Sequence, residues 1–158
     1  MGDDGAMTAM LSQRDGLKVL TQTLAVCSAE RREALDITAD VRDGVRRAGI
    51  HNGLVIANCL HTTCSVLVAE SAPSLLDDFV RLRRRLIDDG NPYRHNDWRL
   101  SGCERGSATA HMPAGLLGHG VALGVTDGEL LLDRSESILL AEWEGPRLRR
   151  VHVQIMGV

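Results

Sequence analysis

β-Branched and aliphatic residues dominate residues 17–26, and the charged residues 30–33 follow them. A run of this kind ended by polar residues is typical of a strand that leads into a turn. Residues 50–53 contain histidine, asparagine and glycine and predict a second turn. The apolar residues 54–60 after that turn, and then residues 65–69, predict two more strands.

A helical pattern lies between the first two strands. Val41, Val45 and Ala48 recur at the spacing of one helix face. Thr38 offers a side-chain oxygen for the N-cap, and the glycine after Ala48 is a common helix end. The sequence therefore predicts an amphipathic helix over residues 38–48.

A second helix is indicated downstream. Ser74 and Asp77 have the spacing of a capping box. The apolar positions that mark one face of this helix are Leu75, Leu76, Phe79, Leu82 and Leu86. We expect the helix to extend to Asp88.

The next segment, residues 89–106, is long, polar and interrupted by glycine and proline. Loops of that length in compact domains are usually functional or disordered, and this one carries His95. A short helical piece over residues 107–117 then presents His111, and Pro113 lies in its first turn or bends it.

The C-terminal half is rich in predicted strands. They cover residues 121–125, 129–132, 138–143 and 147–155. Asp127-Gly128, between the first two, is a hairpin signal. This order of elements predicts an α+β fold with two main helices in which antiparallel sheet dominates, and it disfavours a doubly wound nucleotide-binding fold.

Composition narrows the class of protein. A chain of 158 residues fits one domain, which we place at residues 17–158 after a flexible N-terminal extension, residues 1–16. A net charge of -3 argues against a nucleic-acid partner. The four cysteines lack the C-x-x-C spacing of a zinc knuckle, and no apolar run approaches the roughly 20 residues that span a bilayer. We therefore expect a soluble cytoplasmic protein with no membrane partner.

The most informative stretch is His61-Thr62-Thr63-Cys64-Ser65, at the end of a predicted strand. If His61, His95 and His111 converge, their imidazoles form an acid/base site or the ligand set of an open zinc-like site. A histidine at a strand end is otherwise a satisfied structural side chain, and the spacing of the three matches no short zinc motif.

Several ordered motifs resemble the YjbQ-like family, which is associated with a secondary thiamine-phosphate synthase activity. The resemblance runs from about Leu17 to the C-terminus. Its pieces are Asp36-Ile37-Thr38, Gly53 with the strand into His61-Thr62-Thr63-Cys64-Ser65, Glu70, Leu75-Leu76-Asp77-Asp78, Tyr93-Arg94-His95, Ala110-His111, Asp127-Gly128 and Gly145-Pro146-Arg147-Leu148-Arg149. It departs from the family pattern at Ser107, where asparagine is usual, and at residues 133–136.

The resemblance implies a β-sandwich-like α+β domain assembled as a homotrimer. It also implies an active site that contains His61, His95 and His111. From the chemistry of three imidazoles we expect a divalent metal ion there, zinc or magnesium. Glu70 and Asp78 match the acidic positions of the family, although a shift of one residue makes Asp77 the match instead. These carboxylates would orient the imidazoles or act as a general base. Alternatively, Asp77 is the capping-box acid of its helix and Glu70 is a surface charge.

Other side chains suit an anionic substrate. Thr62 and Thr63 could donate to phosphate oxygens, or pair with neighbouring strands. Arg147 and Arg149 share a strand face by alternation and could hold a phosphate, or they are solvated charges on an edge strand. Cys64 is better suited to be a small buried hydrophobe than a nucleophile.

Three functions fit these observations. The resemblance implies a transferase of the thiamine-phosphate synthase type that acts on phosphorylated small molecules. A metal-dependent hydrolase with the same histidines is an alternative, and a non-catalytic, metal-binding trimer is another.

Overall fold

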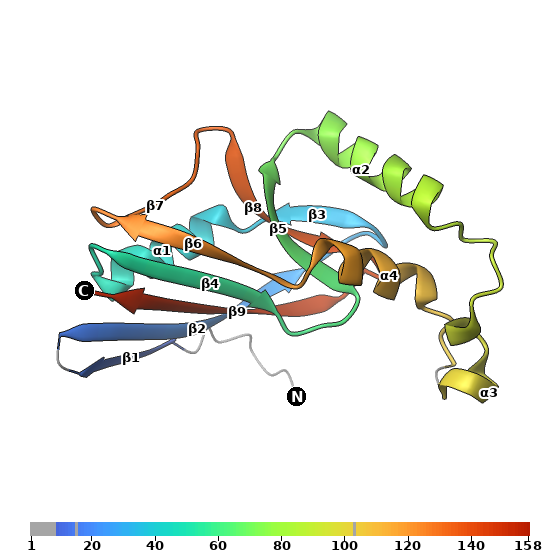
Figure 1. Ribbon diagram of the computed structural model, residues 1–158, viewed down its shortest axis with the longest axis horizontal. Coiled ribbons are helices and arrows are strands. Elements are labelled where there is room, and N and C mark those ends of the chain that lie inside the picture. The colour runs from blue at the N-terminus through green and yellow to red at the C-terminus, as the bar shows by residue number, and fades with distance from the viewer. Residues whose placement is uncertain (1–8, 15, 103) are drawn as a thin grey trace.

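The computed structural model describes residues 9–14, 16–102 and 104–158. Its elements, in chain order, are β1 (Ala9–Arg14), β2 (Leu17–Cys27), β3 (Glu33–Asp36), α1 (Thr38–Ala48), β4 (Gly53–Cys59), β5 (Cys64–Glu70), α2 (Pro73–Leu86), η1 (Arg94–Asn96), α3 (Trp98–Ser101), α4 (Ala108–Leu117), β6 (Gly120–Thr126), β7 (Glu129–Leu130), β8 (Glu136–Glu142) and β9 (Leu148–Gly157). Within the described chain, one sheet has the strand order β1-β2-β9-β4-β6-β7 and a second has the order β3-β8-β5 (Figure 1).

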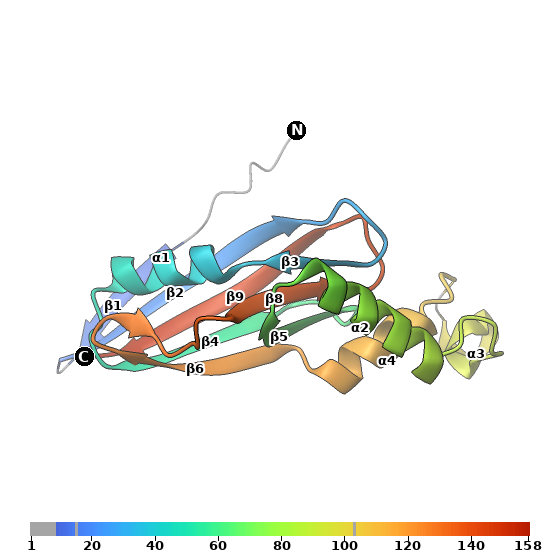
Figure 2. The same ribbon diagram turned by 90° about the horizontal axis from the view of Figure 1, so that it is seen from above.

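All the pairings between described strands are antiparallel. Alternation along β9 shows why the larger sheet has an inner face: Val151, Val153 and Ile155 are fully buried, while the residues between them are more exposed. Helix α1 lies along this sheet in Figure 2 and contributes Val41 and Val45 to the same core. The α+β class with dominant antiparallel sheet is confirmed.

One hydrophobic core joins the two sheets, because buried residues of β4, β5, β8 and β9 belong to a single cluster. A smaller cluster places α4 against the second sheet through Ala110, Ala114, Ala141 and Trp143. The end of β4, the start of β5 and the first turn of α4 therefore meet at one end of the sandwich. This junction carries the histidine motif.

The predicted helix at residues 38–48 is confirmed as α1, and Gly49 ends it in a left-handed conformation with φ of 57°. The predicted N-cap was wrong. The Thr38 hydroxyl accepts a bond from the Ile138 N–H at 2.8 Å, so it joins α1 to β8. An Asp36 oxygen instead accepts from the Thr38 N–H at 2.9 Å.

The second predicted helix is confirmed as α2, but it ends at Leu86, and the capping box was wrong. The helix begins at Pro73, one residue before Ser74, and Ala72 in the N-cap position makes no side-chain cap bond. Proline suits the first helical position because its missing N–H would be unpaired there. Of the α2 residues, all of them described, Arg83 is the one that is buried.

The secondary structure of several segments differs from the sequence prediction. The predicted extension over residues 1–16 contains β1, which pairs with β2, whereas residues 1–8 lie outside the described chain. The predicted loop over residues 89–106 contains η1 and α3, and Cys103 within it is not described. The predicted hairpin is confirmed, with positive φ at Asp127 and Gly128. No helix in the described part of the chain is long and apolar enough to cross a membrane.

Candidate functional site

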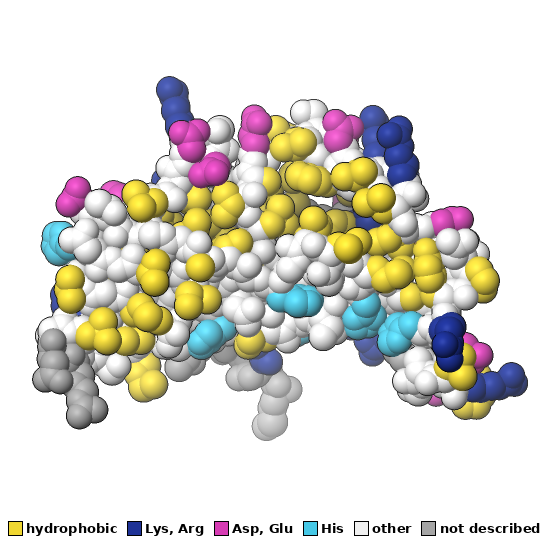
Figure 3. All heavy atoms as spheres, in the orientation of Figure 1, with side chains coloured by type: hydrophobic (Ala, Val, Ile, Leu, Met, Phe, Trp, Pro, Cys, Tyr) yellow, Lys and Arg dark blue, Asp and Glu magenta, His cyan; other side chains and the backbone are white. Residues whose placement is uncertain are grey.

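A cavity of about 340 Å³ opens where the turn between β4 and β5 meets the start of α4 and the first residues of β9. Its lining residues are Leu60, His61, Thr62, Thr63, Arg105, Ser107, His111, Glu144, Arg147 and Arg149. The structure thus brings together two of the three predicted histidines, both threonines and both arginines. Figure 3 shows histidine side chains along the face that carries β4, β6 and α4.

The turn that carries His61, Thr62 and Thr63 is tied at both ends. The Leu60 N–H donates to the Arg150 carbonyl at 3.0 Å, and the Trp143 N–H donates to the Thr63 carbonyl at 3.2 Å. These bonds join the turn to β9 and to the end of β8, so backbone contacts to two separate strands fix its position.

His111 has a defined tautomer. Its Nδ1 lies 3.1 Å from the Thr62 carbonyl oxygen, and because a carbonyl can only accept, Nδ1 carries the hydrogen. Nε2 then has the lone pair, or a second hydrogen once the ring is protonated. The His95 ring meets His111 edge-on, with ring centroids 4.9 Å apart, but His95 does not line the cavity.

His61 has the same tautomer. Its Nε2 accepts the Arg150 N–H at 3.1 Å, so in the neutral ring Nδ1 carries the hydrogen. Burial is the largest effect that lowers the pKa of His61 below its ordinary value, and the positive charge of Arg149 lowers it further. His61 is therefore a neutral donor near pH 7.

Arg149 is bound by the carboxylate of Glu142, a residue that the sequence analysis did not single out. Glu142 is fully buried, and its two oxygens accept from Arg149 Nε at 2.5 Å and Nη2 at 2.6 Å. Thr63 Oγ1 accepts from the same Nη2 at 3.0 Å. The other Nη of Arg149 makes no hydrogen bond within the described chain.

Hydrogen bonds from neighbouring groups keep the Glu142 carboxyl group ionised. Burial alone would raise the pKa of this carboxyl, but the bonds from Arg149 and from the Glu144 N–H at 2.7 Å lower it below its ordinary value. Glu142 is thus an ionised group in the core. The signal in the sequence was an acidic residue at the end of the otherwise apolar predicted strand over residues 138–143.

Arg147 is positioned by local contacts. Its Nε donates to the Glu144 carbonyl at 2.9 Å, and its backbone N–H donates to the Ser28 hydroxyl at 2.9 Å. One third of the side chain stays exposed, and its pairing with the Glu144 carboxylate is loose at 3.4 Å. With Arg105, which the sequence analysis also missed, the cavity wall has three guanidinium groups against the carboxylate of Glu144 on the wall and that of Glu142 behind Arg149.

Glu70 and Asp78 lie elsewhere in the protomer. Glu70 is an exposed residue at the end of β5, across from Glu136. Asp78 is exposed on α2 and pairs with Arg81 at 3.6 Å. Neither lines the cavity, and Asp77 lines a separate pocket.

The arrangement in the protomer does not fit a three-histidine metal site. Among the described residues, no group of three or more histidine, cysteine, aspartate or glutamate side chains is placed to hold an ion. His61 Nε2 has given its lone pair to the Arg150 N–H. Metal binding by His61, His95 and His111 thus stays a prediction.

The Cys64 thiol beside the cavity is structural. Cys59 and Cys64 are buried, as expected for Cys64. The pKa of Cys64 is raised, first by its hydrogen bond with Cys59, then by burial and by the nearby Glu142 carboxylate. A thiol held in its protonated form is a poor nucleophile.

Comparison with known proteins identifies the family. The model of the YjbQ-like UPF0047 proteins matches residues 22–158. The chain belongs to this family. A UPF0047 protein of Archaeoglobus fulgidus is 35% identical over 133 residues, which are 84% of this chain and 98% of that protein. The YugU protein of Bacillus subtilis is 30% identical, over 87% of this chain and 100% of that protein.

Solved structures agree with this membership. A YbjQ-like protein of unknown function from Sulfolobus solfataricus is 28% identical, with a TM-score of 0.83 over 90% of this chain and 99% of its own. A hypothetical protein of Aeropyrum pernix is 32% identical, with a TM-score of 0.79 over 87% and 98% of the two chains. The resemblance seen in the sequence motifs is therefore confirmed for family and fold.

Proposed function

We propose that this YjbQ-like protein is a transferase of the thiamine-phosphate synthase type, which joins a pyrimidine group to a thiazole phosphate. The observation that supports it most is the excess of positive charge in the cavity at the turn between β4 and β5. Guanidinium groups bind phosphate oxygens through paired N–H donors. A phosphorylated small molecule is the ligand class that this lining suits.

The reaction makes a specific demand on the site. A ring nitrogen of the thiazole forms a bond to the methylene carbon of the pyrimidine, while the bond from that carbon to oxygen breaks and pyrophosphate leaves with the electron pair. Charge therefore accumulates on the departing oxygens. Arg105, Arg147 and the free Nη of Arg149 would offset this charge, since donors that are already oriented stabilise it without reorganisation.

The histidines would serve as hydrogen-bonding groups around the same anion. His61, with its hydrogen on Nδ1, is a neutral donor. His111 can accept at Nε2 from a substrate N–H or, once protonated, donate to a phosphate oxygen. The Thr62 carbonyl keeps the His111 ring oriented in both states.

The test is direct formation of thiamine phosphate by the purified protein from the pyrimidine diphosphate and the thiazole phosphate. The wild type should form product, and Arg147→Gln should lower kcat by about 100-fold, the usual effect of removing one donor to a developing charge.

Arg150→Gln is the matched control. Arg150 is an exposed neighbour on β9 that lies outside the cavity lining, and its backbone contact to His61 does not depend on the side chain. The control should keep wild-type rates. A wild-type protein that binds both substrates but forms no product, alone or with added zinc or magnesium, would contradict the proposal.

A further inference from the structure

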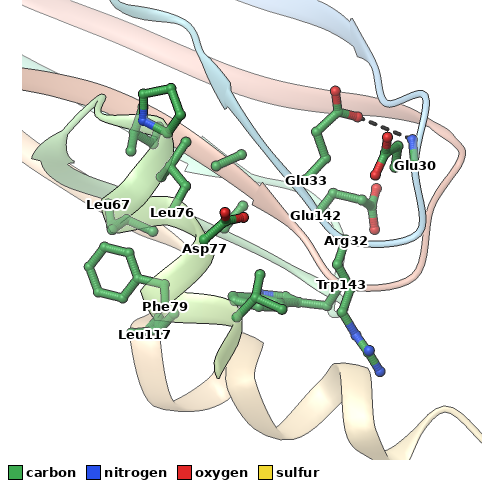
Figure 4. A pocket seen from close by; sticks show the side chains of 15 residues that line it. Glu30, Arg32, Glu33, Leu67, Leu76, Asp77, Phe79, Leu117, Glu142 and Trp143 are labelled. Carbon is green, nitrogen blue, oxygen red and sulfur yellow. Dashed lines mark hydrogen bonds between the residues drawn. The ribbon is translucent and has the colours of Figure 1, made fainter. Parts of the chain in front are cut away.

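A second pocket, which Glu142 helps to line, lies between α2 and the three-stranded sheet (Figure 4). Its volume is about 300 Å³, at the lower end of the range for small-molecule sites. Apolar side chains make up most of its wall: Leu67, Leu76, Phe79, Val80, Leu117, Leu139 and Trp143. We call it the α2 pocket.

Helix α2, which forms one wall of the pocket, is anchored at its C-terminal end. Buried Arg83 donates to both oxygens of Asp89, at 2.9 and 2.8 Å, and to the Thr109 carbonyl at 3.3 Å. These bonds anchor the last turn of the helix to the start of α4. Figure 3 shows hydrophobic side chains gathered on the side of the molecule that carries α2 and β5.

Trp143 gives the pocket a fixed aromatic surface. The side chain is buried, and its Nε1–H donates to Ser65 Oγ at 3.1 Å, which sets the plane of the ring. An indole ring next to a cavity can pack against an apolar ligand or attract a cation through its face.

The charged groups of the pocket are mainly acidic. Glu33 is held by bonds from the backbone N–H groups of Ala29 and Glu30, at 2.8 and 3.2 Å. Asp77 points into the pocket (Figure 4) and makes no hydrogen bond or ion pair within the described chain.

The groups that could balance this charge are engaged elsewhere. Arg32, the cation among the described lining residues, donates to both oxygens of Asp89 at 3.1 Å and is turned away from the pocket (Figure 4). Arg149 pairs with Glu142 rather than with the rim. The α2 pocket thus combines an apolar interior with the carboxylates of Asp77, Glu30 and Glu33, which make no ion pair within the described chain.

We propose that the α2 pocket binds a small organic cation, a protonated amine carried on an aromatic or branched hydrocarbon body. The body fills the space between Phe79 and Trp143, and the ammonium group pairs with Asp77. This site is separate from the phosphate-binding cavity of the proposed function and has the opposite charge, so the two proposals can fail independently.

The test uses phenethylamine as the probe and follows the two tryptophan indole N–H signals by ¹⁵N-resolved NMR. Trp98 is exposed on α3 and outside the pocket, so it is an internal control. Phenethylamine should shift the Trp143 signal in a saturable way and leave Trp98 unchanged. The neutral 2-phenylethanol and the anionic 3-phenylpropionate should bind much more weakly.

Two neighbouring substitutions test the ion pair. Asp77→Asn should weaken phenethylamine binding about tenfold, the usual effect of losing one charged hydrogen bond. Asp78→Asn, next to it on α2 but directed to Arg81, should have no effect on binding. Unchanged thermal melting of both variants establishes that each one folds.

Three results would overturn the proposal. One is the absence of a Trp143 shift up to the solubility limit of the amine. Another is equal binding of the amine and the alcohol, which would mean that the carboxylates do not select charge. The third is a Trp143 shift that follows protein concentration without ligand, because a second copy of the chain would then cover the pocket.

Discussion

At the scale of single residues, the floor of the cationic cavity depends on a buried ion pair. Glu142 and Arg149 are 0% and 4% exposed, and each satisfies the other through two hydrogen bonds. A pair of this kind adds little net stability when both charges are present, but the loss of one partner leaves an unpaired charge in the core. Arg149 therefore neutralises the buried Glu142 carboxylate and also offers an N–H donor to the cavity.

This pair makes a prediction about stability. Arg149→Met should lower the free energy of unfolding by about 3–5 kcal/mol, because the Glu142 carboxylate loses its cation. The double variant with Glu142→Gln should recover a large part of that loss, since no buried charge remains. Chemical denaturation measures both variants, with Arg150→Met as the exposed control. A loss no larger for Arg149→Met than for the control would contradict the role of the pair.

The sequence identified candidate site residues but not the hydrogen bonds that they make. His61, Thr62 and Thr63 stood out because a histidine and two hydroxyl groups follow an apolar strand. Glu142 did not stand out, because its role depends on the position of Arg149 across the fold. The Nδ1–H tautomers of His61 and His111 depend on backbone groups of Arg150 and Thr62, which no local pattern reveals.

At the scale of elements, Asp89 clamps three segments. It accepts from Arg83 at the end of α2 and from Arg32 in the turn between β2 and β3, and Arg83 also reaches the Thr109 carbonyl of α4. The bond from Arg83 is the main cause that lowers the pKa of Asp89 to about 2. The clamp ties the α2 pocket to the helix that carries His111.

Asp89→Asn should destabilise the fold by about 1–2 kcal/mol at neutral pH. This is less than the usual cost of breaking a buried pair, because water screens a carboxylate that is 47% exposed. Since the folded pKa is depressed, the stabilisation is present above the ordinary pKa and is lost as pH falls from 3.8 towards about 2.

Urea denaturation of wild type and variant across this pH range measures the effect. The difference between the two proteins should shrink on acidification. Asp43→Asn, which breaks an exposed pair within α1, should cost less at every pH. A difference between wild type and Asp89→Asn that does not change with pH would contradict the clamp.

The elements themselves were largely predictable, whereas their ends were not. Periodicity located α1 and α2 because each has a continuous apolar face, and paired turn residues located the hairpin at Asp127 and Gly128. Thr38 was misassigned as a cap because a side-chain oxygen can serve either its own helix or a distant strand, here Ile138. The strand β3 was missed because its partner β8 is far away in the sequence.

At the scale of the whole molecule, we propose that the chain assembles as the homotrimer that its family resemblance implies. Glu70 and Asp78 lie outside the cavity of their own protomer, so an acidic contribution from them would have to come from a neighbouring copy. Light scattering after size exclusion should give three times the 17.2 kDa mass of the chain. A monomeric mass at working concentrations would remove these two residues from the site.

The charge of the cationic cavity is also a feature of the whole molecule. This charge comes from a loop residue, Arg105, from Arg147 just before β9 and from Arg149 in β9, which the fold brings to the turn between β4 and β5. Charge that converges from distant segments is a property of the folded chain, and the net charge of -3 gives no indication of it.

Calorimetric titration with pyrophosphate therefore tests the proposed site most directly. The wild type should bind pyrophosphate saturably, Arg147→Gln should bind at least about tenfold more weakly, and Arg150→Gln should match the wild type. Absence of binding, or equal weakening by both substitutions, would contradict the assignment of this cavity as the phosphate site.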